Sequence, residues 1–243
     1  MKIQLLLIFF TLFSQANATV FDVTITNLTT GMHFSQMLVT AHIESDPLFT
    51  PGQLASNAIE TMAESESFVD FGSVGNVDLD TFKPAFPTSD LLNPGEKTSK
   101  VTLNTDSTAN ANHTHLSIVG RLIPTNDGFV GLNSYKVPTS VGTYQVYMNA
   151  WDAGTENNDE NVISTVQGNN NTGIPQHTEL NFNNSGSGLT FTRDENANKI
   201  GVHIHRGNLG DLVTNGSSSD ISDLDRRIHR FMNPVALVTI TVK

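Results

Sequence analysis

The segment Ala236-Leu237-Val238-Thr239-Ile240-Thr241-Val242 has an apolar residue at every second position, from Ala236 through Val238 and Ile240 to Val242. This period of two predicts a β-strand with one buried face. The segment Val20-Phe21-Asp22-Val23-Thr24-Ile25-Thr26 has the same pattern. We expect these two strands, which lie far apart in the sequence, to share one sheet and close the domain.

Further strand-like runs lie between these two segments, at residues 100–103, 116–122, 143–147, 189–192 and 201–205. Connections such as 167–173, 183–188 and 215–219 are rich in Asn, Gly, Ser and Asp, which favour turns. Seven or more short strands predict an all-β fold, either a sandwich or a barrel. Only residues 54–64 place their apolar side chains on one helical face, so we expect one short helix.

The composition is acidic and lacks cysteine. The 243 residues include 24 Asp and Glu against 13 Lys and Arg, giving a net charge of −11. This balance disfavours a nucleic-acid partner and makes a divalent cation the more natural charged partner. Without cysteine there is no thiol catalysis, no disulfide and no Cys-ligated zinc or iron–sulfur cluster.

The first residues predict a signal peptide. Lys2 precedes a mainly apolar stretch at 3–13, and Ala16-Asn17-Ala18 matches a cleavage site, so we assign residues 1–18 to the signal peptide. The alternative is a short membrane anchor, but the stretch is below the roughly 20 residues that span a bilayer. No linker divides the rest. We expect 19–243 to be one exported domain, secreted or periplasmic, with no integral membrane segment.

Two acidic segments follow predicted strands. Residues 124–131 contain Asp127, and residues 149–160 contain Asp152 and Glu156. Loops after neighbouring antiparallel strands can meet at one end of a sandwich, where calcium takes about six to eight oxygens at about 2.3–2.6 Å. An Ala-Gly-Thr turn can fold the chain back so that Asp152 and Glu156 face one point. The three carboxylates are candidate ligands for one calcium ion. The alternative is that they are solvated acids of an acidic protein.

Both segments match a known pattern. Asn126-Asp127-Gly128-Phe129-Val130-Gly131-Leu132-Asn133-Ser134, followed by Trp151-Asp152-Ala153-Gly154-Thr155-Glu156, resembles the spondin N-terminal domain family of F-spondin and mindin. The family patterns there are approximately Pro-Asp-Trp-Phe-Val-Gly and Tyr-Asp-Ala-Gly-Thr-Asp. His203-Ile204-His205-Arg206-Gly207 and Asn233-Pro234-Val235-Ala236 resemble the secreted bacterial branch of that family. The likeness covers nearly all of residues 19–243.

The resemblance implies a C2-like antiparallel β-sandwich that binds one calcium ion through three acids on loops at one end. That role falls on Asp127, Asp152 and Glu156. It also implies extracellular adhesion or ligand binding, with an unidentified protein or glycan as partner. The chain departs from the animal pattern at Gly128, where an aromatic is usual, at Glu156, where Asp is usual, and in lacking the animal domains' cysteines.

Two His-x-His pairs, His113 with His115 and His203 with His205, offer a competing interpretation. On a strand the two imidazoles of each pair share a face and could bind zinc or copper in an enzyme. Otherwise they are strand histidines that pack or form hydrogen bonds. The chain has no Gly-x-Ser-x-Gly elbow, no His-Glu-x-x-His helix and no phosphate-binding glycine loop. We therefore expect a non-enzymatic binding module, with a metalloenzyme or a purely structural exported protein as alternatives.

Overall fold

The computed structural model of the protein describes residues 19–73, 83–84, 91–105, 112–160, 174, 200–212 and 222–243. The predicted signal peptide, the predicted strand at 189–192 and the connections at 167–173, 183–188 and 215–219 lie outside these residues. The elements are β1 (Val20–Asn27), β2 (His33–Phe34), β3 (Leu38–His42), α1 (Asn57–Ser65), the 3-10 helix η1 (Val69–Ser73), β4 (Lys83–Pro84), β5 (Val101–Asn104), β6 (His115–Ile123), β7 (Gly128–Lys136), β8 (Gly142–Asp152), β9 (His203–Ile204) and β10 (Ala236–Val242).

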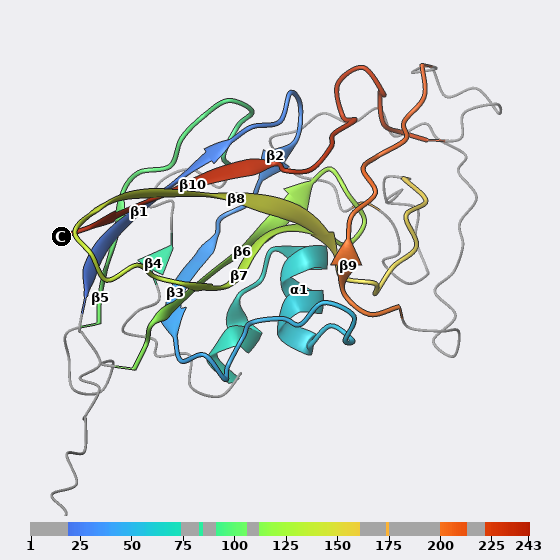
Figure 1. The fold of residues 1–243 in the computed structure, drawn as a ribbon. Coiled ribbons are helices and arrows are strands. Elements are labelled where there is room, and N and C mark those ends of the chain that lie inside the picture. Colours follow the sequence, from blue (N-terminus) through green and yellow to red (C-terminus); the bar gives the residue numbers. More distant parts are fainter. Residues whose placement is uncertain are drawn as a thin grey trace, which may run out of the picture.

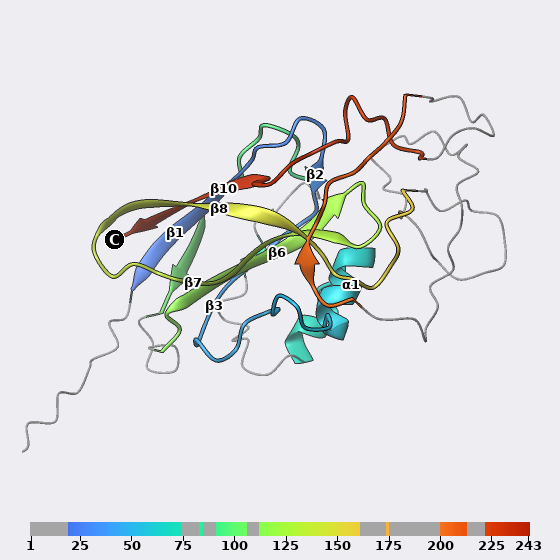
Figure 2. The same ribbon diagram turned by 45° about the vertical axis from the view of Figure 1, so that its right-hand side comes forward.

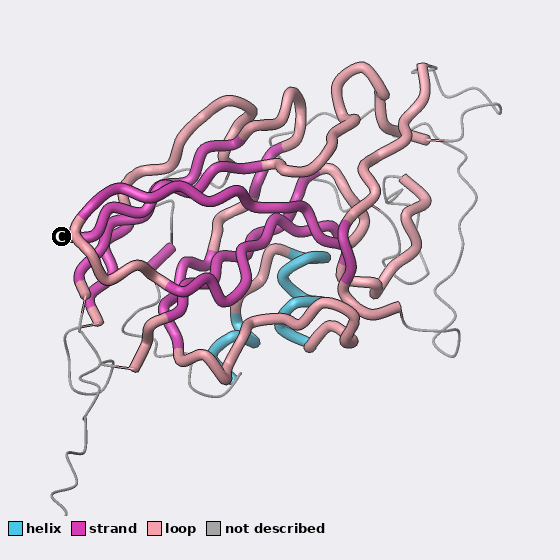
Figure 3. The backbone as a smooth tube through the Cα atoms, viewed as in Figure 1, coloured by secondary structure: helices cyan, strands magenta, loops and turns pink. Residues whose placement is uncertain are grey.

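All these strands belong to one antiparallel sheet with the order β4-β3-β6-β7-β8-β10-β1-β5. β2 pairs with β6, and β9 pairs with β8. β10 lies between β1 and β8, so the two strongly alternating segments share one sheet, as predicted, and they are direct neighbours in it. β5 also contacts β3 and β4, because the sheet curls until its two ends approach each other. Figures 1 and 3 show this curled sheet with α1 at one side.

The main core fills the inside of the curl. It combines the inward residues of β1 and β10, among them Val23, Ile25, Val238 and Ile240, with those of β3, β6 and β7 on the opposite side. Each outward position of β10 is only partly buried, which accounts for the alternation in its sequence. The prediction of an all-β, sandwich-like fold with one short helix is confirmed.

A second, smaller core lies on the outer face of the β3-β6-β7 half of the sheet. There Ala58, Ile59, Met62 and Ala63 of α1 pack in one apolar cluster with Leu38, Val119 and Phe129 of the strands. β6 is therefore buried along its whole length. None of the helices in the described parts of the chain has the length and apolar character needed to cross a membrane.

The helix begins later than the expected start at residue 54. Ser56 is its N-cap, and its hydroxyl accepts a hydrogen bond from the amide of Ile59. Gly52 and Gln53 lie in a turn that is bound to Val202: the Gly52 amide donates to the Val202 carbonyl, and the Val202 amide donates to the Gln53 carbonyl, both at 2.7 Å. This backbone pairing excludes a helix before the cap, and Leu54 is exposed.

Residues 128–131 lie in β7, contrary to the expectation that they form part of a loop. The connection from β6 to β7 is thus short, and Asp127 lies immediately before β7. β8 then divides its pairing: residues 142–148 pair with β10, and residues 149–152 pair with β7. The end of β8 also pairs with β9 on its other side, as Figures 1 and 2 show. Three separate segments therefore meet around Asp152.

Candidate metal centre

Asp127 and Asp152 lie side by side at one end of the sheet. Gly128 is the register partner of Asp152, and the amide of Ala153 donates to the carbonyl of Asp127 at 3.2 Å. Both aspartates are buried, with exposed fractions of 0% and 1%. A side chain at residue 128 would have its Cβ 2.5 Å from the hydroxyl of Thr125, so glycine is needed for this close packing. The structure thus brings the two acidic segments together at these two residues.

Only one of the two carboxylate oxygens of Asp127 has hydrogen-bond partners. Its Oδ2 accepts hydrogen bonds from the amides of Thr155 and Glu156 at 2.7 and 3.0 Å, and from the Thr155 hydroxyl at 3.2 Å. Its Oδ1 is buried and has no hydrogen-bond partner. Burial and the nearby charge of Asp152 raise the pKa of Asp127 to about 7. A buried, charged oxygen without a partner indicates that a proton, a water or a cation belongs there.

The carboxylate of Asp152 is held by its own loop. Its Oδ1 accepts the amide of Gly154 at 2.8 Å, and its Oδ2 accepts the side-chain amide of Asn158 at 2.6 Å. Gly154 has a φ of +71°, and a Cβ there would stand 2.0 Å from the carbonyl oxygen of Ile200. The predicted turn after Asp152 therefore forms, and it requires glycine.

Glu156 is placed differently from expectation. The turn brings its backbone amide, rather than its carboxylate, onto Asp127. Its charge favours the protonated form of Arg121, whose pKa is lowered by burial and raised most by Glu66. In the described part of the chain, no three His, Asp or Glu side chains come together in a way that could hold a metal ion. The structure thus brings together two of the three predicted ligands.

A buried guanidinium contacts the turn that carries Asp127. Arg121 is 1% exposed, and it donates to Glu66 Oε1 at 2.9 Å and to the carbonyl oxygen of Thr125 at 3.2 Å. It ties β6 to the residue that ends α1 and to the β6–β7 turn that carries Asp127. The sequence shows one arginine in an apolar run, which does not reveal this role.

The residues after Glu156 supply contacts that sequence reasoning missed. Asn126 donates to Asp159 at 2.8 Å and accepts the amide of Glu160 at 3.2 Å. The buried carboxylate of Glu160 accepts the amide of Gly210 and the hydroxyl of Ser222, both at 2.8 Å. These bonds anchor the acidic loop to the later part of the chain. The run Asn157-Asn158-Asp159-Glu160 was the available signal, but its partners are distant in sequence.

The histidines of the second His-x-His pair point to different surroundings. His203 is exposed on β9, and its Nε2 lies 3.7 Å from Asp152 Oδ2. His205 is buried, its Nδ1 accepts the amide of Gly207 at 3.0 Å, and its Nε2 has no hydrogen-bond partner. Burial lowers the pKa of His205 to about 4, although Asp152 favours the charged ring. The competing interpretation, in which the two rings of this pair share one metal site, does not fit this arrangement.

The first pair lies at the other end of β6. His113 and His115 are both buried, and His115 is the register partner of His42 on β3. The rings of His42 and His115 are 6.4 Å apart. His42 is fully engaged, since its two nitrogens contact the Ile43 carbonyl and the Ser117 hydroxyl, each at 2.7 Å. These contacts fit packing histidines better than metal ligands.

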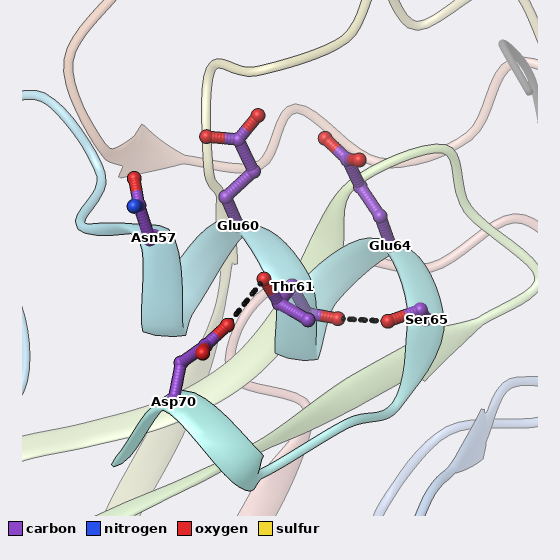
Figure 4. Close-up of a pocket in the computed structure, with 6 residues that line it drawn as sticks. All are labelled: Asn57, Glu60, Thr61, Glu64, Ser65 and Asp70. Atoms are coloured by element: carbon purple, nitrogen blue, oxygen red, sulfur yellow. Dashed lines mark hydrogen bonds between the residues drawn. The ribbon is translucent and has the colours of Figure 1, made fainter. Parts of the chain in front are cut away.

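A shallow acidic pocket of about 370 Å³ lies elsewhere, along the outer side of α1. It is lined by Asn57, Glu60, Thr61, Glu64, Ser65 and Asp70. Figure 4 shows that Thr61 donates to Asp70 across the gap between α1 and η1, at 2.9 Å, while Glu60 and Glu64 point away from that contact. None of the predicted site residues lines this pocket.

Comparison with known proteins identifies the family. The family model described as Spondin_N matches residues 7–195, a range that contains Asp127, Asp152 and Glu156. No curated protein matches the chain. Since the matched residues make up well over half of the sequence, the chain belongs to the spondin N-terminal domain family.

Proposed function

We propose that the protein is an exported calcium-binding module that recognises an extracellular protein or glycan and has no enzymatic activity. Membership of the spondin N-terminal family supports a spondin-type module. The observation that carries the calcium proposal is the buried Asp127 Oδ1, which has no hydrogen-bond partner and lies beside the charge of Asp152. A hard cation prefers carboxylate oxygens of this kind.

Asp127 and Asp152 would hold the ion, with Glu156 as the third acid if its carboxylate turns toward them. Bound calcium would supply positive charge that cancels the repulsion between the aspartates. The chain itself preorganises the site. The amides of Thr155 and Glu156 fix Asp127, and those of Gly154 and Asn158 fix Asp152, so both carboxylates are oriented before any ion binds.

The same contacts link the site to a possible binding surface. The loop from Ala153 to Glu160 forms hydrogen bonds with Asp127 near its start and with Asn126 at its end. An ion between the aspartates would therefore stiffen this loop and the β6–β7 turn together. A ligand that contacts them would meet a preorganised edge and lose less conformational entropy on binding.

Thermal unfolding in chelator and in millimolar calcium tests the proposal. Binding to the folded state raises its stability by mass action, by about 2.7 kcal/mol at a hundredfold excess over Kd. We expect a calcium-dependent rise in Tm that Asp127→Asn and Asp152→Asn abolish and Glu156→Gln weakens. Asp22→Asn is the matched control and should keep the rise, because Asp22 lies on β1 and is paired with Lys100 and Lys243. No effect of calcium on the wild type would refute calcium binding and favour a purely structural role.

A further inference from the structure

Asp152 faces a second potential ligand that the calcium proposal does not use. β9 pairs with the end of β8 so that His203 is the register partner of Asp152. Residues paired in this way point to the same side of the sheet. The His203 Nε2 and the Asp152 Oδ2 lie 3.7 Å apart, which is too far for a hydrogen bond.

A hydrogen bond of His203 sets the tautomer of its neutral ring. Its Nδ1 lies 3.0 Å from the carbonyl oxygen of Gly201, and a carbonyl can only accept, so Nδ1 carries the proton. In the neutral ring Nε2 then has a free lone pair, 3.7 Å from the Asp152 carboxylate oxygen. Two acceptors that face each other at this distance repel unless a cation or a proton lies between them. Metal-binding histidines commonly donate their other N–H to a backbone carbonyl in this way.

The distance suits a small divalent cation. With zinc bonds of about 2.05 Å to nitrogen and about 2.1 Å to oxygen, a separation of 3.7 Å gives an angle of about 125° at the metal. The tetrahedral angle of about 109° needs a separation of about 3.4 Å, so a movement of about 0.3 Å would suffice. The exposed side chain of His203 can make this adjustment, whereas Asp152 is held by Gly154 and Asn158.

His205, the other half of the motif, is not available as a ligand. Its Nδ1 accepts the Gly207 amide, so the proton of the neutral ring is on Nε2, which is also buried. The described chain thus offers one carboxylate and one imidazole at this point. Water would fill the remaining positions, because the His203 side chain is 44% exposed.

We propose that Asp152 and His203 form an exchangeable site for a borderline divalent cation of the zinc class. Imidazole nitrogen is a ligand that such ions favour and that calcium does not. Zinc binding here does not depend on calcium binding, because it rests on His203 whereas calcium binding rests on Asp127 Oδ1. The two ions share Asp152, so each should weaken the binding of the other.

Isothermal titration of the purified protein with zinc chloride, without calcium, tests this site. We expect one zinc ion per chain, with the affinity reduced at least tenfold by His203→Gln and unchanged by His33→Gln, the matched histidine control. Histidine ¹⁵N spectra should show the Nε2 resonance of His203 move when zinc is added. Zinc binding that survives His203→Gln, or a wild type that binds no zinc, would overturn the proposal.

The calcium response separates the two proposals. His203→Gln should leave the calcium-dependent rise in Tm intact, while Asp127→Asn should remove that rise and leave zinc affinity within about twofold. If zinc binding fails while calcium binding holds, only the zinc proposal is wrong. If calcium binding fails while zinc binding is lost in His203→Gln, only the calcium proposal is wrong.

Discussion

The unpartnered oxygen of Asp127 predicts that replacing this aspartate by asparagine stabilises the protein when no cation is present. Asparagine keeps the shape and the acceptor that Thr155 and Glu156 use, but it removes the charge that faces Asp152. It also places an amide donor where the wild type has an unpartnered acceptor. The buried charge should therefore disfavour the folded wild type relative to the variant.

The size of the effect follows from these contacts. An unsatisfied buried polar group costs about 1–3 kcal/mol, and the variant no longer has this cost. Its hydrogen bonds to Oδ2 are weaker because the charge is lost, which offsets about 0.5–1.5 kcal/mol of the gain. We expect Asp127→Asn to gain about 1–2 kcal/mol in chelator at pH 8. A protein of this size gains about 2–4 °C in Tm per kcal/mol, so the rise in Tm is about 2–8 °C.

Calorimetry in chelator, with Asp22→Asn as the matched control, measures this difference. Asp22 is a carboxylate whose partners, Lys100, Lys243 and Thr102, satisfy it, so its replacement should lower Tm.

The pH dependence of Tm supplies a second check. The pKa of Asp127 in the folded state, about 7, lies above its ordinary value of 3.8, so the wild type regains stability as the pH falls through 7. The difference in Tm between Asp127→Asn and the wild type should then become smaller. A fall in Tm for Asp127→Asn like that for Asp22→Asn would refute the reasoning.

Three further predictions concern the stability of the fold. Arg121→Met leaves Glu66 without its buried partner and should cost about 3–5 kcal/mol in urea unfolding; a cost below 1 kcal/mol would contradict this. Although burial opposes them, hydrogen bonds from lysines and a threonine lower the pKa of Asp22 to about 2, below its usual 3.8. Its stabilising contribution, measured against Asp22→Asn, should be constant above about pH 5 and disappear as the pH falls through 2. In Gly154→Ala, the alanine would have to adopt the positive φ of this position, and its Cβ would clash with the carbonyl oxygen of Ile200. The variant should therefore have a lower Tm in calcium and in chelator alike.

Sequence pattern revealed the alternating strands β1 and β10 and also the fully buried β6, but it missed β3 and β7. β1 and β10 alternate because one face meets the core and the other is partly open. β3 and the first half of β7 are buried on both faces, so their sequences lack the alternation that identifies a strand. The helix was located by its apolar face, but its start depended on the pairing of Gly52 with Val202, a contact across the sequence.

The site was predictable to the extent that it depends on neighbouring strands. Asp127 and Asp152 meet because β7 and β8 pair side by side, and turn chemistry predicted the fold-back after Asp152. The direction of the Glu156 side chain was not predictable, since backbone amides fill the place next to Asp127. His203 reaches Asp152 only through a two-residue strand from a remote part of the chain. His205 lies beyond that strand, so the alternation of faces expected for His-x-His did not apply.

The position of β10 has a consequence for when the protein can fold. This strand follows every other described strand in the sequence, yet it lies between β1 and β8 and joins the two halves of the sheet. Until it is added, β1 and β8 each present an open edge, and the core between the halves stays incomplete. A chain emerging from the ribosome therefore cannot reach its stable state early. The sheet can close only once β10 has been synthesised, whatever the order in which the earlier strands form.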